Sequence, residues 1–252
     1  MAGLAAALRP SAPARTPAFT PAFVALVVCS WVAFGVWGTS TDHLDHARTL
    51  TTWRDVALFA IGWLVMVTAM MLPAATALFA TVGGLAGRSW DAVRVHGTVG
   101  AGFASVWVLV GLAFRAGDVI VHTAIDATGV RLHSGTIAAA LLLLSGVHQF
   151  SSSKRRCLVR CRSPRGLVIR LWSGRHRTLD AFRIGSSYGW SCVGCCWALM
   201  LLAFALAAAN PAWMLVLGLV MAVEKNVRGA RRFSSAVGVA LIAGGALAFA
   251  SA

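Results

Sequence analysis

Long apolar runs limit what this chain can fold into. Seven runs of mostly apolar residues alternate with short polar or basic segments, and they cover 20–38, 56–81, 97–114, 134–150, 188–209, 211–224 and 234–251. About 20 apolar residues in a helix cross the hydrocarbon core of a bilayer. Helices and closed barrels alone satisfy their backbone polar groups there. The runs therefore predict an all-α fold: a polytopic transmembrane bundle of about seven spans.

Composition excludes an ordinary soluble enzyme and a disordered chain. Charged residues make up 12% of the sequence and hydrophobic residues 58%, whereas soluble domains carry about 25% charged residues. The mean hydropathy is +0.76. A water-soluble chain of this length could not bury so much apolar surface. We therefore expect the lipid bilayer as a partner.

Loop charge predicts the orientation of the spans. Segment 151–187 holds ten Lys and Arg residues against Asp180 alone, and segment 225–233 holds four. Basic loops stay in the cytoplasm, so an even number of crossings separates these two segments. That supports the short run 211–224, for which Asn210 and Pro211 supply the N-cap and first turn.

This orientation predicts a simple domain organisation. We expect a cytoplasmic N-terminal tail over 1–19 and a single integral membrane domain over 20–252, with a basic cytoplasmic loop at 151–187. Run 20–38 is interpreted as an uncleaved span, since no small-x-small cleavage site follows it. The basic loop favours contact with anionic lipid headgroups. It lacks the interleaved aromatic residues that stack on bases, so no nucleic-acid partner is expected.

Cysteines are the strongest chemical signal. Five of the six gather on the predicted cytoplasmic side: Cys157, Cys161, Cys192, Cys195 and Cys196. Thiols stay reduced in the cytoplasm, so structural disulfides are not expected. The C-x-x-C step from Cys192 to Cys195 is typical of thiolate metal sites and of redox motifs. In a helix, Cys192, Cys196 and Met200 share one face, and neighbouring Arg residues would favour the thiolates.

Methionines add candidate ligands at membrane depth. Met66 and Met70 share a helix face in run 56–81, and Pro73 should kink that helix. Spacing alone also fits ordinary packing. Thioethers and thiolates together suit Cu(I), and thiolates also suit zinc. We therefore expect a metal ion bound by these sulfurs, copper(I) in preference to zinc, with Met66, Met70 and Met200 as membrane-depth ligands.

Other polar residues carry weaker signals. Glu224 is interpreted as an interfacial partner of Lys225 or Arg228, although a charge near membrane depth is also a functional candidate. Segment 42–46, Asp-His-Leu-Asp-His, fits an ordinary polar loop better than a cation site. Nucleophile-elbow, P-loop and His-Glu-x-x-His motifs are all missing from the sequence, so we do not expect an enzyme.

Several motifs carry a family resemblance. They are Met66-x-x-x-Met70-Met71-Leu72-Pro73, His148-Gln149, Lys154-x-x-Cys157-Leu158-x-x-Cys161-Arg162-Ser163-Pro164, Gly189-x-x-Cys192-x-Gly194-Cys195-Cys196-Trp197-Ala198-Leu199-Met200, Asn210-x-x-Trp213-Met214 and Glu224-Lys225. Over about 56–250, the chain resembles a bacterial family of predicted metal-binding integral membrane proteins, a domain family of unknown function. Some of its members are labelled copper chaperones. The resemblance implies a multi-pass protein of the bacterial inner (plasma) membrane.

Three functions follow as hypotheses. The first is a membrane protein that binds a soft metal, copper foremost, through the cytoplasm-facing cysteines and delivers or moves it. It would exchange metal with another membrane or metal-delivery protein. The second is a membrane thiol oxidoreductase that uses the C-x-x-C-C patch. The third is a structural subunit of a larger membrane complex, in which the cysteines hold one zinc ion.

Overall fold

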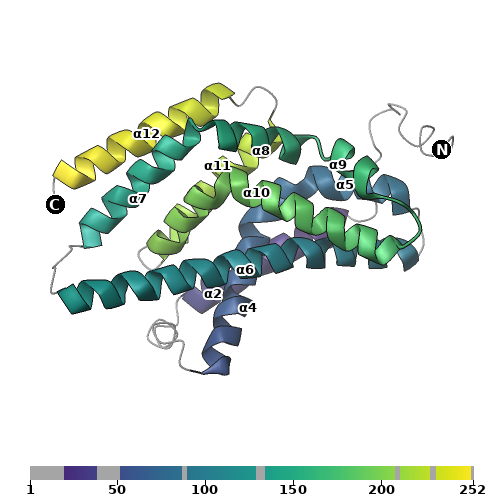
Figure 1. Ribbon diagram of the computed structural model, residues 1–252, viewed down its shortest axis with the longest axis horizontal. Coiled ribbons are helices and arrows are strands. Elements are labelled where there is room, and N and C mark those ends of the chain that lie inside the picture. Colours follow the sequence, from purple (N-terminus) through teal and green to yellow (C-terminus); the bar gives the residue numbers. More distant parts are fainter. Residues whose placement is uncertain are drawn as a thin grey trace.

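The computed structural model describes residues 20–38, 52–86, 90–128, 134–207, 211–227 and 231–250. These residues form helices and no strands, which confirms the all-α prediction (Figure 1). The helices are α2 (Thr20–Gly38), α4 (Trp53–Met71), the 3-10 helix η1 (Pro73–Ala75), α5 (Thr76–Ala86), α6 (Trp90–Thr128), α7 (Ser134–Gln149), α8 (Ser152–Arg162), α9 (Arg165–Leu171), α10 (Arg177–Ala207), α11 (Pro211–Asn226) and α12 (Arg231–Ala250). The tail 1–19, segment 42–46 and Asn210 lie outside the described residues.

Fewer helices qualify as membrane spans than the seven apolar runs predicted, and the helices differ widely in length. In the described part of the chain, four are long and apolar enough to cross a membrane: Trp53–Met71, Asp91–Thr128, Arg177–Leu206 and Arg231–Ala250. The apolar stretches Phe23–Val36, Pro73–Gly83 and Gly135–Gln149 are shorter. Helix α11 has 16 residues and ends with charged side chains. The structure therefore does not support about seven spans.

Two segments expected to be loops are helical. Helix α6 continues through most of 115–133, and it ends at Thr128. The basic loop 151–187 contains α8, α9 and the first turns of α10. Leu, Arg and Lys are good helix formers, and the Ser151 hydroxyl caps α8 by accepting a hydrogen bond from the Lys154 N–H. Basic composition indicated exposure here, but it did not indicate an irregular backbone.

At the expected kink, a 3-10 turn that begins at Pro73 interrupts the α-helix. Helix α4 ends at Met71, and one 3-10 turn over Pro73–Ala75 leads into α5. Proline lacks the backbone N–H that would continue the helix, and its ring clashes with the preceding turn. The interruption leaves Met71, which is buried, at the end of α4.

Helix α10 is the centre of the molecule. It packs on α6, α7, α8, α9 and α11, while α7 pairs with α12 and α2 with α4 (Figure 1). Its crossing with α6 depends on glycine: a Cβ on Gly185 would lie 2.1 Å from the Val99 carbonyl oxygen, and one on Gly102 would lie 2.3 Å from that of Phe182. Small residues at helix contacts permit this close approach.

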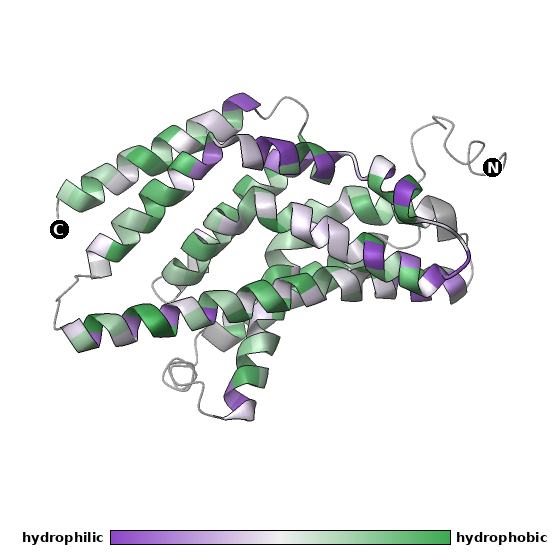
Figure 2. Ribbon diagram, in the orientation of Figure 1, coloured by the Kyte–Doolittle hydropathy of each residue, from purple (hydrophilic) through white to green (hydrophobic). Residues whose placement is uncertain are grey.

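Polarity is unevenly distributed over the helices. Figure 2 shows mostly apolar residues along α7, α10, α11 and α12, with hydrophilic residues gathered on α8 and on the first turns of α10 and α12. On α8, Arg155, Arg156 and Arg160 are exposed, whereas Lys154 and Cys161 are buried. Helix α8 therefore presents a basic surface outward and supplies a thiol to the interior.

Candidate functional site

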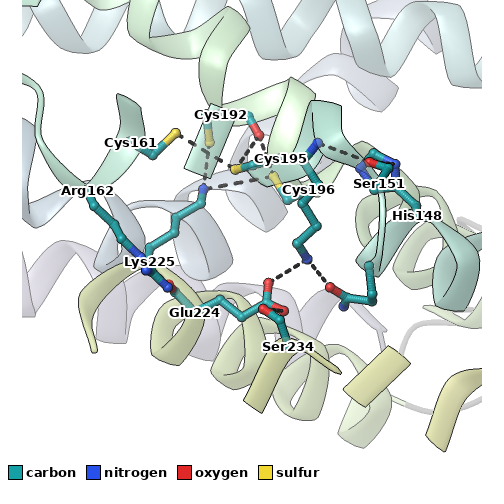
Figure 3. A network of polar contacts seen from close by, with 12 residues as sticks. His148, Ser151, Cys161, Arg162, Cys192, Cys195, Cys196, Glu224, Lys225 and Ser234 are labelled. Carbon is teal, nitrogen blue, oxygen red and sulfur yellow. Dashed lines mark hydrogen bonds and ion pairs between the residues drawn. The ribbon is translucent and has the colours of Figure 1, made fainter. Parts of the chain in front are cut away.

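Five sulfur atoms from three helices meet beneath α8, and we call this group the sulfur cluster. It comprises Met71 of α4, Cys161 of α8, and Cys192, Cys195 and Cys196 of α10, all buried. The sulfur of Met71 lies 3.8 Å from that of Cys192 and 3.7 Å from that of Cys196. The sulfurs of Cys161 and Cys195 are 3.8 Å apart. Figure 3 shows the cysteines facing one another between α8 and α10.

Local features of three helices bring these sulfurs together. Cys192 and Cys196 are four residues apart, so they lie on one face of α10. Helix α8 approaches α10 closely at Gly194, where a Cβ would lie 2.5 Å from the Cys157 sulfur. The Tyr188 hydroxyl donates a 3.2 Å hydrogen bond to the Cys161 carbonyl oxygen, which fastens the end of α8 to α10.

Lys225 of α11 reaches into the sulfur cluster. Its ammonium nitrogen lies 2.9 Å from the Cys192 sulfur and 3.9 Å from that of Cys196 (Figure 3). It also lies 3.7 Å from the Met71 sulfur. The side chain is buried. The motif Glu224-Lys225 was noted in the sequence, but nothing there placed the lysine among thiols.

A polar network beside the cluster fastens α8 to α11 and α12. The Lys154 ammonium donates to Glu224 Oε2 at 2.7 Å and also to Gln149. The Ser234 hydroxyl donates to Glu224 Oε1 at 2.8 Å, and the Arg162 guanidinium donates to the Glu224 carbonyl oxygen. Glu224 therefore pairs with Lys154, whereas Lys225, one of its two expected partners, points to the sulfurs instead. Arg228, the other expected partner, lies outside the described residues.

The other predicted ligands lie nearby but outside the cluster. Cys157 is half-buried on α8 and packs at Gly194. Met66, Met70 and Met200 belong to the same buried core, and none of their sulfurs has a described polar contact with a cysteine. A Cβ on Gly218 would lie 3.5 Å from Met70, which is ordinary packing against α11. The participation of these four residues stays a prediction.

The pKa values of the two thiols on α8 are raised. Burial, with the neighbouring Cys195, raises the pKa of Cys157 despite the opposing charge of Arg160. The hydrogen bond with Cys195, followed by burial, raises the pKa of Cys161 well above its usual value. Arg160 thus favours the Cys157 thiolate as expected, but burial and Cys195 outweigh its effect on the pKa.

Comparison with known proteins identifies the family. The profile of the PpoB2 family, described as copper chaperone, matches residues 60–248, which include all five residues of the sulfur cluster. The chain belongs to this copper chaperone family. Searches of curated proteins and of solved structures returned no match.

The sulfur cluster offers thiol and thioether donors that suit copper, but its thiols bond to one another and to the backbone. Donors about 2.3 Å from a tetrahedral metal lie about 3.8 Å apart, close to the sulfur separations here. Among the described residues, however, no group of three or more His, Cys, Asp or Glu side chains surrounds a common point. The thiols of Cys195 and Cys196 instead donate to the Cys192 carbonyl oxygen, at 3.1 and 2.8 Å. A metal ion would replace the protons of these thiols, so both hydrogen bonds would be lost on binding.

Proposed function

We propose that this chain is an integral membrane copper chaperone that binds Cu(I) at the sulfur cluster. The observation that carries the proposal is the convergence of four thiols and one thioether, from three helices, in a buried volume. Such soft donors favour Cu(I), and zinc competes only for the thiolates. The copper chaperone family supports the same metal.

The proposed ligand set extends the sequence prediction. Cys161, Cys192, Cys195 and Cys196 are the central ligands, and Met71 joins them because its sulfur contacts two of the thiols. Met66, Met70 and Met200 remain proposed membrane-depth ligands. They lie in the same core and would take part if copper moves further along α4 and α10.

Cys157 is the proposed point of entry for copper. It is the one partly exposed thiol on α8, one helical turn from Cys161. A metal ion captured there from a donor protein could pass by ligand exchange to Cys161 and then to the thiols of α10. The basic face of α8 would lie against anionic lipid headgroups or receive the donor.

The proposed setting is the inner membrane of a bacterium. The four long apolar helices are compatible with a multi-pass protein, and loop charge favours a cytoplasmic N-terminus and a cytoplasmic α8. The buried Lys154–Glu224 ion pair would hold α8 over the cluster. Copper would thus be protected from water and exchanged on the cytoplasmic side.

Metal content tests the proposed function. The full chain, purified anaerobically in detergent and loaded with Cu(I), should retain copper, measured by mass spectrometry. The variant Cys192→Ser/Cys195→Ser/Cys196→Ser should lose most of it. Cys29→Ser is the matched control, because Cys29 is an exposed thiol on α2 away from the cluster. Equal copper in the wild type and the triple variant would refute the proposal, and zinc in place of copper would favour a structural site.

A thiol oxidoreductase is the second candidate. It is favoured by the 3.8 Å approach of the Cys161 and Cys195 sulfurs across two helices. This pair would exchange two electrons and two protons with an external thiol–disulfide couple. Alkylation of the protein in glutathione buffers of defined potential separates the candidates, since a redox pair should titrate near a cytosolic potential. Thiols that stay reduced throughout would exclude this function.

A further inference from the structure

Lys225 is a buried lysine whose ammonium lies among sulfur atoms and is not paired with a carboxylate in the described structure. Its ammonium is buried, and it contacts the sulfurs of Cys192, Met71 and Cys196. The adjacent carboxylate of Glu224 is engaged by Lys154 and Ser234. A buried charge is costly unless it is compensated, so the sulfur cluster is the group with which this ammonium balances its charge.

The ammonium covers one side of a sulfur triangle. The Met71 sulfur lies 3.8 Å from that of Cys192 and 3.7 Å from that of Cys196. The Lys225 ammonium reaches all three sulfurs from α11. A metal ion bound by these sulfurs would be a close neighbour of the ammonium, even after the lysine side chain moved aside. Their mutual repulsion is proportional to the charge of the ion, so a divalent ion is repelled twice as strongly as a monovalent ion.

The net charge of the site also favours a monovalent ion over a divalent one. Within the triangle that Lys225 contacts, the thiolates of Cys192 and Cys196, one Cu(I) and one ammonium sum to zero, with the other two cysteines as neutral thiols. Zinc in place of copper leaves a net positive charge in the same buried volume. Net charge in a low-dielectric interior is unfavourable. The lysine therefore offsets the charge of a monovalent copper site and disfavours a divalent one.

We propose that Lys225 is a specificity-determining residue, whose ammonium among the sulfurs of Met71, Cys192 and Cys196 makes the site select monovalent over divalent soft ions. This inference rests on the proposed copper function and deepens it. It assigns discrimination between metals to a residue that is not itself a ligand, while the thiols and the thioether supply affinity.

Matched metal pairs test this inference without any assay of delivery. Cu(I) with Zn(II), and Ag(I) with Cd(II), are pairs of soft or borderline d10 ions that differ by one unit of charge. Affinities would be measured by competition with chelators, anaerobically, on the full chain in detergent. The variants are Lys225→Leu, which is apolar, and Lys225→Gln, which is neutral and polar. Lys225→Arg is the charge-retaining control.

The expected result is a change in the affinity ratio. In both neutral variants, the monovalent-to-divalent ratio should fall by about tenfold or more for each ion pair, mainly because divalent binding strengthens. Lys225→Arg should keep the wild-type preference. Helical circular dichroism and the elution volume would confirm that the variants fold, and two neutral variants guard against the misfolding of one.

The outcomes separate this inference from the proposed function. A wild type that binds Cu(I) through its cysteines, with ratios unchanged in folded Lys225→Leu and Lys225→Gln, would overturn the inference and leave the function standing. Loss of discrimination in Lys225→Arg as well would also overturn it, since positive charge would then not be the cause. A wild type with no cysteine-dependent Cu(I) binding would refute the proposed function itself.

Discussion

At the scale of single residues, Met71 and Met70 give a matched test of which thioether belongs to the site. The Met71 sulfur contacts Cys192 and Cys196, whereas Met70 packs against Gly218. Met71→Leu keeps the side-chain volume and removes the soft donor, so Cu(I) affinity should fall by about tenfold with a stability loss below about 1.5 kcal/mol.

Met70→Leu should change affinity less than Met71→Leu does. Both variants would be measured by Cu(I) competition and by thermal unfolding in the same detergent. If Met70→Leu proved the more damaging change for copper binding, the ligand would lie on the face predicted from sequence, and the sulfur cluster would be misassigned.

Cys157 gives a prediction about rate. As the partly exposed thiol next to a buried cluster, it should capture copper without being essential for holding it. Cys157→Ser should slow loading from a Cu(I) donor about tenfold or more, while copper per protein at equilibrium changes little. Stopped-flow transfer kinetics with metal analysis would measure both. A loading rate equal to that of the wild type would place the entrance elsewhere.

Residue patterns in the sequence predicted part of the site. The C-x-x-C-C spacing identified Cys192, Cys195 and Cys196, because residues three and four apart share a helix face. Lys225 was missed because its role arises from a contact between α10 and α11, which no local spacing encodes. Met71 was passed over because the spacing of four residues favoured Met66 and Met70, whereas the sulfur that contacts the thiols is that of Met71. The helix interruption at Pro73 could have pointed to Met71, because it places this residue at the end of α4.

At the scale of helices, the crossing of α6 with α10 should depend on two glycines. A Cβ on Gly185 would lie 2.1 Å from a backbone oxygen of α6, so Gly185→Ala must push the helices apart. We expect a loss of about 1–3 kcal/mol of stability or more, and weaker Cu(I) binding because α10 carries three cluster cysteines. Thermal unfolding in detergent would measure the change.

Gly100→Ala is the matched control on α6. A Cβ there has nothing within 4 Å, so this variant should be neutral or slightly more stable, since Ala is the better helix former. Similar melting temperatures for Gly185→Ala and Gly100→Ala would contradict the described crossing.

Hydrophobicity predicted where the helices lie better than it predicted where each helix begins and ends. Each apolar run overlaps a helix, but α6 and α10 extend well beyond theirs, with Asp118 in α6 and Asp180 in α10. Polar helical turns look like loops when only hydropathy is considered. Asp180 shows what holds such a turn: its carboxylate accepts hydrogen bonds from the Ser173 and Gly174 N–H groups at 2.9 and 3.0 Å. A contact of this kind has no signature in hydropathy.

At the scale of the whole molecule, the account predicts membrane integration with a cytoplasmic α8–α9 segment. The four long apolar helices should keep the chain in the membrane pellet after alkaline carbonate extraction. A reporter inserted at the exposed turn near Gly174 should have cytoplasmic activity. Extraction into the soluble fraction, or a periplasmic reporter signal, would contradict the proposed topology.

The central claim is that copper is held by sulfur from α8, α10 and the end of α4. X-ray absorption at the copper edge, on the anaerobically loaded full chain, tests it most directly. The account predicts Cu(I) with sulfur neighbours only, and a loss of sulfur scattering in Cys192→Ser/Cys195→Ser/Cys196→Ser but not in Cys29→Ser. A first shell dominated by nitrogen or oxygen, or a spectrum unchanged in the triple variant, would contradict it.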